Sequence, residues 1–177
     1  MWRGTVGAML LTILTISGRI VNAQNESPRV RPEGDAIRAL IDRGIEQSAT
    51  FRDLTTTLGN TNVIVYVRFA PCSAGVPACL LWASAEGGAR RLLIKIDRFG
   101  RSPDEQTALL AHELQHANEV ASDPGIRDFI SFQTSFASRG WKHGAGFETG
   151  EAITISRKVA AELTRSERGG GFERRRP

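Results

Sequence analysis

The sequence is poor in cysteine and histidine, and it lacks long apolar runs beyond its first residues. Its 177 residues include two cysteines and three histidines. The cysteines form no CxxC motif and have no histidine near them, which argues against a cysteine-based metal site. No later segment is long enough to span a bilayer, and no internal repeat is present. The chain after position 23 has the size of one ordinary domain with a single core.

Clustered positive charge is also absent from the body of the chain. The formal net charge is +4, and five arginines with two glutamates lie in residues 165–177. The three consecutive glycines at 169–171 indicate that residues 165–177 form a flexible basic tail. The body before it is close to neutral. It therefore offers no basic, aromatic-bearing surface for nucleic acid.

The first 23 residues are typical of a secretory signal peptide. Arg3 precedes an apolar stretch over residues 8–16, and Val21-Asn22-Ala23 resembles a cleavage site. We therefore expect an exported protein, periplasmic or extracellular, that meets the membrane only through this segment. In that compartment Cys72 and Cys79 are expected to form a disulfide. Residues 24–33 are polar and carry two prolines, so we expect a flexible amino terminus there.

Two of the three histidines lie in an HExxH motif, His112-Glu113-Leu114-Gln115-His116, within an apolar stretch that is predicted to be helical. Residues four apart share one helix face with Cβ atoms roughly 5–6 Å apart, so both imidazoles can bind one zinc ion. Glu113 lies about 100° further around the helix. Its carboxylate is therefore free to act as a general base on water at the metal. The motif predicts a metal-dependent hydrolase, most often a peptidase.

The residues around the motif favour a helix with a defined start and one buried side. Ser102 is expected to cap the helix, Pro103 to occupy its first position, and Glu105 to complete a capping box. Apolar residues lie on the side opposite the two histidines, where they can face a core. They are Leu110, Leu114, Ala117 and Ala121.

This segment resembles the zincin metallopeptidases, whose extended motif has uncharged residues at the positions of Leu114, Gln115 and Ala117. The glycine and third histidine of the metzincin extension do not follow. The chain is therefore similar to a small gluzincin, in which the third metal ligand is a glutamate on a later helix. The resemblance implies an α+β fold with a small, mostly antiparallel sheet of about three strands, packed against the HExxH helix and further helices. It also implies an edge strand that binds the substrate backbone, a role that we expect for residues 91–97.

A catalytic zinc ion needs a third protein ligand beside the two histidines. Glu148 is the first choice, because it begins a segment of helical periodicity that runs to Leu163 and so matches the gluzincin arrangement. Glu151 lies one turn further and can serve instead, or can orient a histidine. Glu119 shares the face of the two histidines, but its place on the same rigid helix favours hydrogen bonding over metal binding. His143 is the last alternative, and we predict a catalytic role for it as a hydrogen-bond donor to the developing oxyanion.

Residues 34–164 are expected to form the peptidase domain. Helical spacing and caps predict further helices at 35–47, 51–58 and 123–137, the last begun by Asp123-Pro124. Alternation and turn residues predict strands at 62–69, 80–85 and 91–97, with a hairpin at Gly87-Gly88. Residues 140–146 are expected to form an active-site loop, in which Trp141 lines the substrate cleft or covers the core. The spacing of Phe129, Phe132 and Phe136 predicts a stripe that faces the core.

These observations predict an exported peptidase that binds one Zn²⁺ ion and hydrolyses a peptide or protein substrate, with Glu113 as general base. The same ligands also fit an exported zinc-binding module without catalytic activity, which acts by binding a partner. A structural protein without metal is the third class, and the histidine spacing argues against it. Metal content and chelator-sensitive cleavage distinguish the three.

Overall fold

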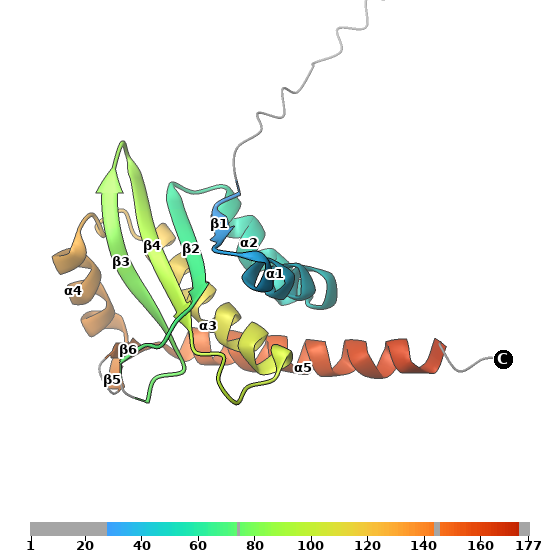
Figure 1. Cartoon of the computed structure of the whole chain (residues 1–177). Helices are drawn as coiled ribbons and strands as arrows, with labels where there is room; N and C mark the ends of the chain where they lie inside the picture. Colours follow the sequence, from blue (N-terminus) through green and yellow to red (C-terminus); the bar gives the residue numbers. More distant parts are fainter. Residues whose placement is uncertain (1–27, 74, 144–145, 174–177) are drawn as a thin grey trace, which may run out of the picture.

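The computed structural model describes residues 28–73, 75–143 and 146–173 (Figure 1). The predicted signal peptide, residues 1–23, lies outside the described residues. The described chain is an α+β fold, with a four-stranded sheet, a separate two-stranded sheet and five helices. No helix within the described residues is long and apolar enough to cross a bilayer.

The main sheet is mixed, which corrects the prediction of about three mostly antiparallel strands. Its order is β1 (Val30–Pro32), β2 (Val63–Phe69), β4 (Ala89–Ile96) and β3 (Ala78–Glu86). The pairings β1–β2 and β2–β4 are parallel, and only β3–β4 is antiparallel. The reason is the connections. Two helices between β1 and β2 form a crossover long enough for parallel pairing, whereas Gly87-Gly88 closes a tight hairpin between β3 and β4.

Strand β1 lies within the segment that was predicted to be a flexible amino terminus, so that prediction is wrong for residues 30–32. Backbone hydrogen bonds extend the parallel pairing on both sides of the strand, from Val65 N–H to Arg29 O and from Glu33 N–H to Val67 O, each at 2.8 Å. The side chain of Val30 is buried in the core. Pairing and burial therefore order this segment, and Pro32 is tolerated because it lies on an edge strand.

The helices pack on one side of the sheet (Figure 1). They are α1 (Asp35–Gln47), α2 (Ala49–Gly59), α3 (Pro103–Ser122), α4 (Phe129–Arg139) and α5 (Gly150–Glu173). Helix α3 contacts β2, β3, β4 and α5, and it carries the HExxH motif into the centre of the fold. The predicted capping box at its start is present, with Ser102 and Glu105 bonding each other's backbone. The predicted core residues Leu110, Leu114 and Ala117 are fully buried.

Helix α4 begins at Phe129, not at Asp123 as predicted. Asp123 instead ends α3 as its C-cap. The capping box of α4 lies at Asp128, whose carboxylate accepts a hydrogen bond of 2.8 Å from Ser131 N–H. The Ser131 hydroxyl in turn accepts one of 3.0 Å from Asp128 N–H. This second cap satisfies the first turn of α4, and it leaves residues 124–127 as a turn between the helices.

The carboxyl-terminal residues do not begin a flexible tail at Arg165, because α5 continues to Glu173. Arg165 donates a hydrogen bond of 3.1 Å to Ala161 O within this helix. Glu167 forms an ion pair of 2.7 Å with Arg43 of α1. Contacts to another helix therefore accompany the continuation of α5. Residues 174–177 lie outside the described residues.

A buried arginine joins the sheet to the end of α3. Arg90 of β4 is 8% exposed and donates hydrogen bonds to the carbonyl oxygens of Val120, Ala121 and Asp123. These carbonyls end the helix, where they lack partners within the helix itself. A cation is also favourable at a helix carboxyl terminus. Arg90 therefore fixes the far end of the helix that carries the histidines.

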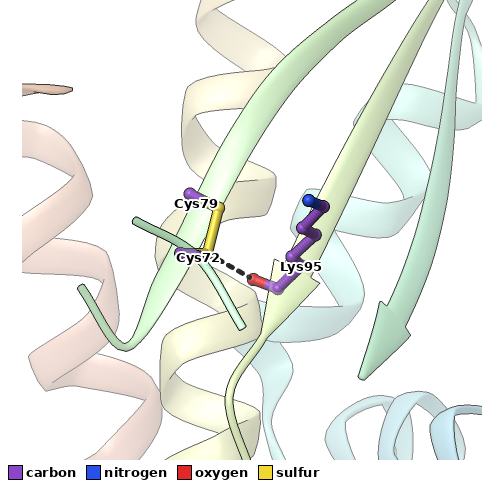
Figure 2. Close-up of a disulfide and its surroundings, with 3 residues drawn as sticks. All are labelled: Cys72, Cys79 and Lys95. Atoms are coloured by element: carbon purple, nitrogen blue, oxygen red, sulfur yellow. Dashed lines mark hydrogen bonds between the residues drawn. A yellow bond between two sulfur atoms is a disulfide. The ribbon is translucent and has the colours of Figure 1, made fainter. Parts of the chain in front are cut away.

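The predicted disulfide between Cys72 and Cys79 is present (Figure 2). It closes the loop before β3 onto the first residues of that strand. Cys72 Sγ lies 3.7 Å from the carbonyl oxygen of Lys95 on β4, so the loop is held against the sheet. A disulfide indicates an oxidising compartment of the kind that exported proteins meet.

Candidate metal and catalytic site

The two histidines of α3 and Glu148 converge on one point. Nε2 of His112 lies 2.9 Å from Oε1 of Glu148, and Nε2 of His116 lies 3.4 Å from the same oxygen. One ligand atom from each residue lies within 4.8 Å of the others. The structure therefore brings together the three residues that the sequence analysis selected as metal ligands.

These donors fit a metal ion. A tetrahedral ion with bonds near 2.0–2.1 Å places its ligand atoms about 3.3–3.5 Å apart. The two Nε2–Oε1 distances, 2.9 and 3.4 Å, are close to that spacing. Two imidazoles and a carboxylate also form a common ligand set for transition metals. The three side chains are only partly exposed or buried, as expected for a site at the bottom of a cleft.

Glu148 arrives from a strand end and not from the first turn of a helix, as predicted. Strands β5 (Trp141–His143) and β6 (Gly146–Glu148) pair antiparallel, with Trp141 opposite Glu148. A Cβ atom on Gly140 would lie 2.2 Å from the carbonyl oxygen of Glu148, so this position has no room for a side chain. The close approach of Gly140 thus sets the place of the third ligand.

Thr149 connects the third ligand to α5 and α3. Its hydroxyl accepts a hydrogen bond of 3.3 Å from Ala152 N–H in the first turn of α5. It also donates one of 2.8 Å to Oε1 of Glu119. The other oxygen of Glu119 lies 2.9 Å from Nδ1 of His116. Glu119 therefore orients a histidine by hydrogen bonding, the role that its place on α3 favoured.

The remaining alternatives for the third ligand differ in outcome. Glu151 is exposed on α5 and is not part of the metal-ligand group. The backbone of His143 lies in β5, but its side chain lies outside the described residues. Its role as a donor to the oxyanion therefore stays a prediction.

Glu113 is buried next to the ligand group. It is 6% exposed, and it lines the same pocket as His116 and Glu148. Burial raises the pKa of its carboxyl group, although the charges of His116 and His112 and a backbone hydrogen bond from Leu80 act in the opposite direction. Glu113 is thus set apart from the three ligands and faces the cleft, as a group that acts on a substrate or water must.

The metal-free site is held by charge pairing. Burial opposes the charged form of His116, but hydrogen bonds to Glu119 and Glu148 outweigh it and raise its pKa to about 9. Burial likewise opposes ionisation of Glu148, yet hydrogen bonds from His112 and His116 lower its pKa to about 2. A bound metal ion takes the place of the proton on such a histidine, so metal binding releases it.

A pocket of about 220 Å³ opens beside these residues, between β3 and α4. The predicted aromatic stripe of α4 lines it, which corrects the expectation that Phe129, Phe132 and Phe136 all face the core. Phe136 is buried, whereas Phe129 is 53% exposed at the other end of the stripe. Trp141 is 50% exposed and is not among the described residues that line the pocket.

The edge strand beside the site is β3. Residues 91–97 were expected to take this position, but they belong to β4, which lies between β2 and β3. The hairpin explains the exchange, because β4 folds back and pairs with β2 on its other side. Ala78, Leu80 and Trp82 of β3 line the pocket.

Sequence reasoning missed Thr149 and the pocket walls on β3. A threonine directly before a helical segment is a signal for an N-cap, and that signal was available for Thr149. Its bond to Glu119 joins residues 30 positions apart, so no local pattern reports it. Comparison with protein family models, with curated proteins and with solved structures finds no match for this chain.

Proposed function

We propose that this chain is an exported, zinc-dependent peptidase similar to a small gluzincin. The observation that supports this best is the convergence of His112, His116 and Glu148 on one point, with the buried Glu113 beside it. Two imidazoles with one carboxylate leave a tetrahedral zinc ion a fourth position for water or substrate. The Cys72–Cys79 disulfide supports a periplasmic or extracellular location.

The residues divide the chemistry among them. When bound, Zn²⁺ supplies a Lewis acid for the substrate carbonyl and lowers the pKa of water. His112, His116 and Glu148 hold the ion, and Glu119 keeps the His116 ring in place. The Glu113 carboxylate takes a proton from the attacking water and passes it to the leaving amine.

The edge strand β3 supports a peptide as the substrate. Within the described residues, β3 pairs only with β4, so its other edge presents backbone donors and acceptors beside the site. An extended peptide can add to such an edge by backbone hydrogen bonds. This mode of binding positions a peptide bond next to the metal ligands without demanding a particular sequence.

The test is metal content together with cleavage of a quenched fluorescent peptide library. We expect one zinc ion per chain and cleavage that a chelator abolishes. Glu113→Gln should keep the metal and lose roughly 10²- to 10⁴-fold in kcat, whereas His116→Ala should lose the metal. Glu151→Gln is the matched control, because it removes an exposed carboxylate outside the ligand group.

Two results would contradict the proposal. Cleavage by Glu113→Gln at the rate of the unaltered protein would exclude Glu113 as the general base. Stoichiometric zinc without cleavage of any library member would favour the alternative, a zinc-binding module that acts by binding a partner.

A further inference from the structure

The pocket beside the metal-ligand group is enclosed mainly by apolar side chains. Glu113, His116 and Glu148 line it where it meets the metal-ligand group. From there it extends between α4 and the first half of β3. Phe132 lies at the centre of one wall, with its ring centroid 6.0 Å from Trp82 and 5.0 Å from Phe136.

The disulfide loop forms another part of the wall. Cys72, Cys79 and Val76 line the pocket together with Leu80 and Leu81 of β3. A register shift between Trp82 and Ser84 marks a bulge in β3 at this place. Bulges re-aim side chains and occur near active sites. Trp82, at one side of this bulge, lines the pocket with its neighbours.

We propose that this pocket binds one large apolar side chain of the substrate, aromatic or long aliphatic, at a residue flanking the bond that is cut. The inference rests on the proposed peptidase function. A volume of about 220 Å³ accommodates a single side chain of this size. Its continuity with Glu113 and the ligand group favours a substrate side chain as the occupant.

The edge of β3 explains how the side chain enters. Side chains of an extended peptide alternate between two faces. A peptide paired to β3 therefore directs every second side chain to the same side, and one of these can enter the pocket while the neighbouring bond lies at the metal ligands. Length and shape of that side chain then select the substrate, while the backbone pairing does not.

Phe129 is the specificity-determining residue that can be tested without disturbing the core. It lines the pocket and is 53% exposed. Ile130, the next residue of α4, is 75% exposed and is not among the described lining residues. Phe129→Lys and Ile130→Lys therefore introduce the same charge into the same helix turn, but only the first places it at the pocket.

The experiment uses the full exported chain loaded with zinc and a peptide series in which the two residues flanking the cleaved bond are varied in turn. At one of the two positions, phenylalanine or leucine should give kcat/KM at least about tenfold above alanine, the range that apolar pockets reach. Phe129→Lys should reduce this preference about tenfold, and Ile130→Lys should leave it unchanged. Equal cleavage of all peptides, or equal effects of the two variants, overturns the inference and leaves the peptidase function standing.

A binding measurement separates the inference from the proposed function. Calorimetric titration of zinc-loaded Glu113→Gln with the phenylalanine and alanine peptides should show at least about tenfold tighter binding of the former. That preference without cleavage by the unaltered protein refutes the peptidase function and supports an apolar binding pocket. Cleavage by the unaltered protein with no preference in binding or in kcat/KM refutes the pocket. Neither cleavage nor preferential binding refutes both.

Discussion

Nδ1 of His116 lies 2.9 Å from Oε2 of Glu119, three residues further along the same helix. A carboxylate that accepts a hydrogen bond from Nδ1 keeps Nε2 of the ring available for a metal, and it fixes the ring plane. Thr149 holds the other oxygen of the same carboxylate. The position of the ring therefore depends on residues from α3 and from the start of α5.

Glu119→Ala should weaken zinc binding by about 10- to 100-fold, because the His116 ring loses the group that orients it. Competition with a chromophoric chelator measures the affinity directly. Glu151→Ala removes an exposed carboxylate from the neighbouring helix and should leave the affinity unchanged. An unchanged affinity in both variants would mean that Glu119 does not support the metal site.

Arg90→Met should destabilise the fold by about 2–4 kcal/mol, because several buried carbonyl oxygens at the end of α3 lose their donor. Urea unfolding followed by circular dichroism gives the difference in free energy. Arg91→Met is the matched control. Arg91 is the next residue of β4, with a side chain 30% exposed and an ion pair of 3.4 Å to Glu86, so its loss should cost less than about 1 kcal/mol.

Stability should fall in acid through Glu162. Its carboxylate accepts hydrogen bonds of 2.6 Å from Ser48 Oγ and of 2.7 Å from Thr50 Oγ1 at the start of α2. Burial alone would raise the pKa of Glu162, but these bonds outweigh it and the net shift is downward from 4.5. Because the folded-state pKa is the lower one, this stabilisation is present above about pH 4.5 and is lost as the pH falls through the folded value.

Glu162→Gln should therefore be less stable than the unaltered protein at pH 7, by about 1 kcal/mol, and the difference should shrink below pH 4. Unfolding by urea at several pH values measures it. Glu46→Gln, at an exposed site on α1, should follow the unaltered protein at every pH. A constant difference across the pH range would show that the charge of Glu162 contributes nothing.

Removal of the disulfide should have two separate effects. Replacement of Cys72 and Cys79 by serine opens a loop with a sequence separation of 7, which costs about 2 kcal/mol on the chain-entropy model. Because both cysteines line the pocket, the same variant should also bind the phenylalanine peptide more weakly. Addition of a reductant should weaken binding by the unaltered protein and have no effect on the double variant.

The parts of the site that the sequence predicts are those with local causes. The capping box at Ser102 and Glu105, the spacing of His112 and His116, and the apolar face of α3 all depend on residues within one helix. Helix spacing also predicts the bounds of α1 to the residue. Local patterns decide such elements because capping and amphipathicity act over a few residues.

The parts that the sequence does not predict depend on contacts between distant segments. Strand order is one, since the same hairpin at Gly87-Gly88 is compatible with either strand at the sheet edge. The cap by Arg90 joins β4 to carbonyls about thirty residues later. The phenylalanine stripe of α4 has the spacing of a core face, and only the position of β3 turns that face into a pocket wall.

Gly140 has a consequence for the recognition of related proteins. Any side chain there would collide with the backbone of Glu148, so an exchange for alanine would push the third ligand away from the histidines. A relative that keeps both histidines but has a larger residue at this place should have lost its metal. A search for functional homologues is therefore sharper when it requires a glycine eight positions before the glutamate, in addition to the helical pair.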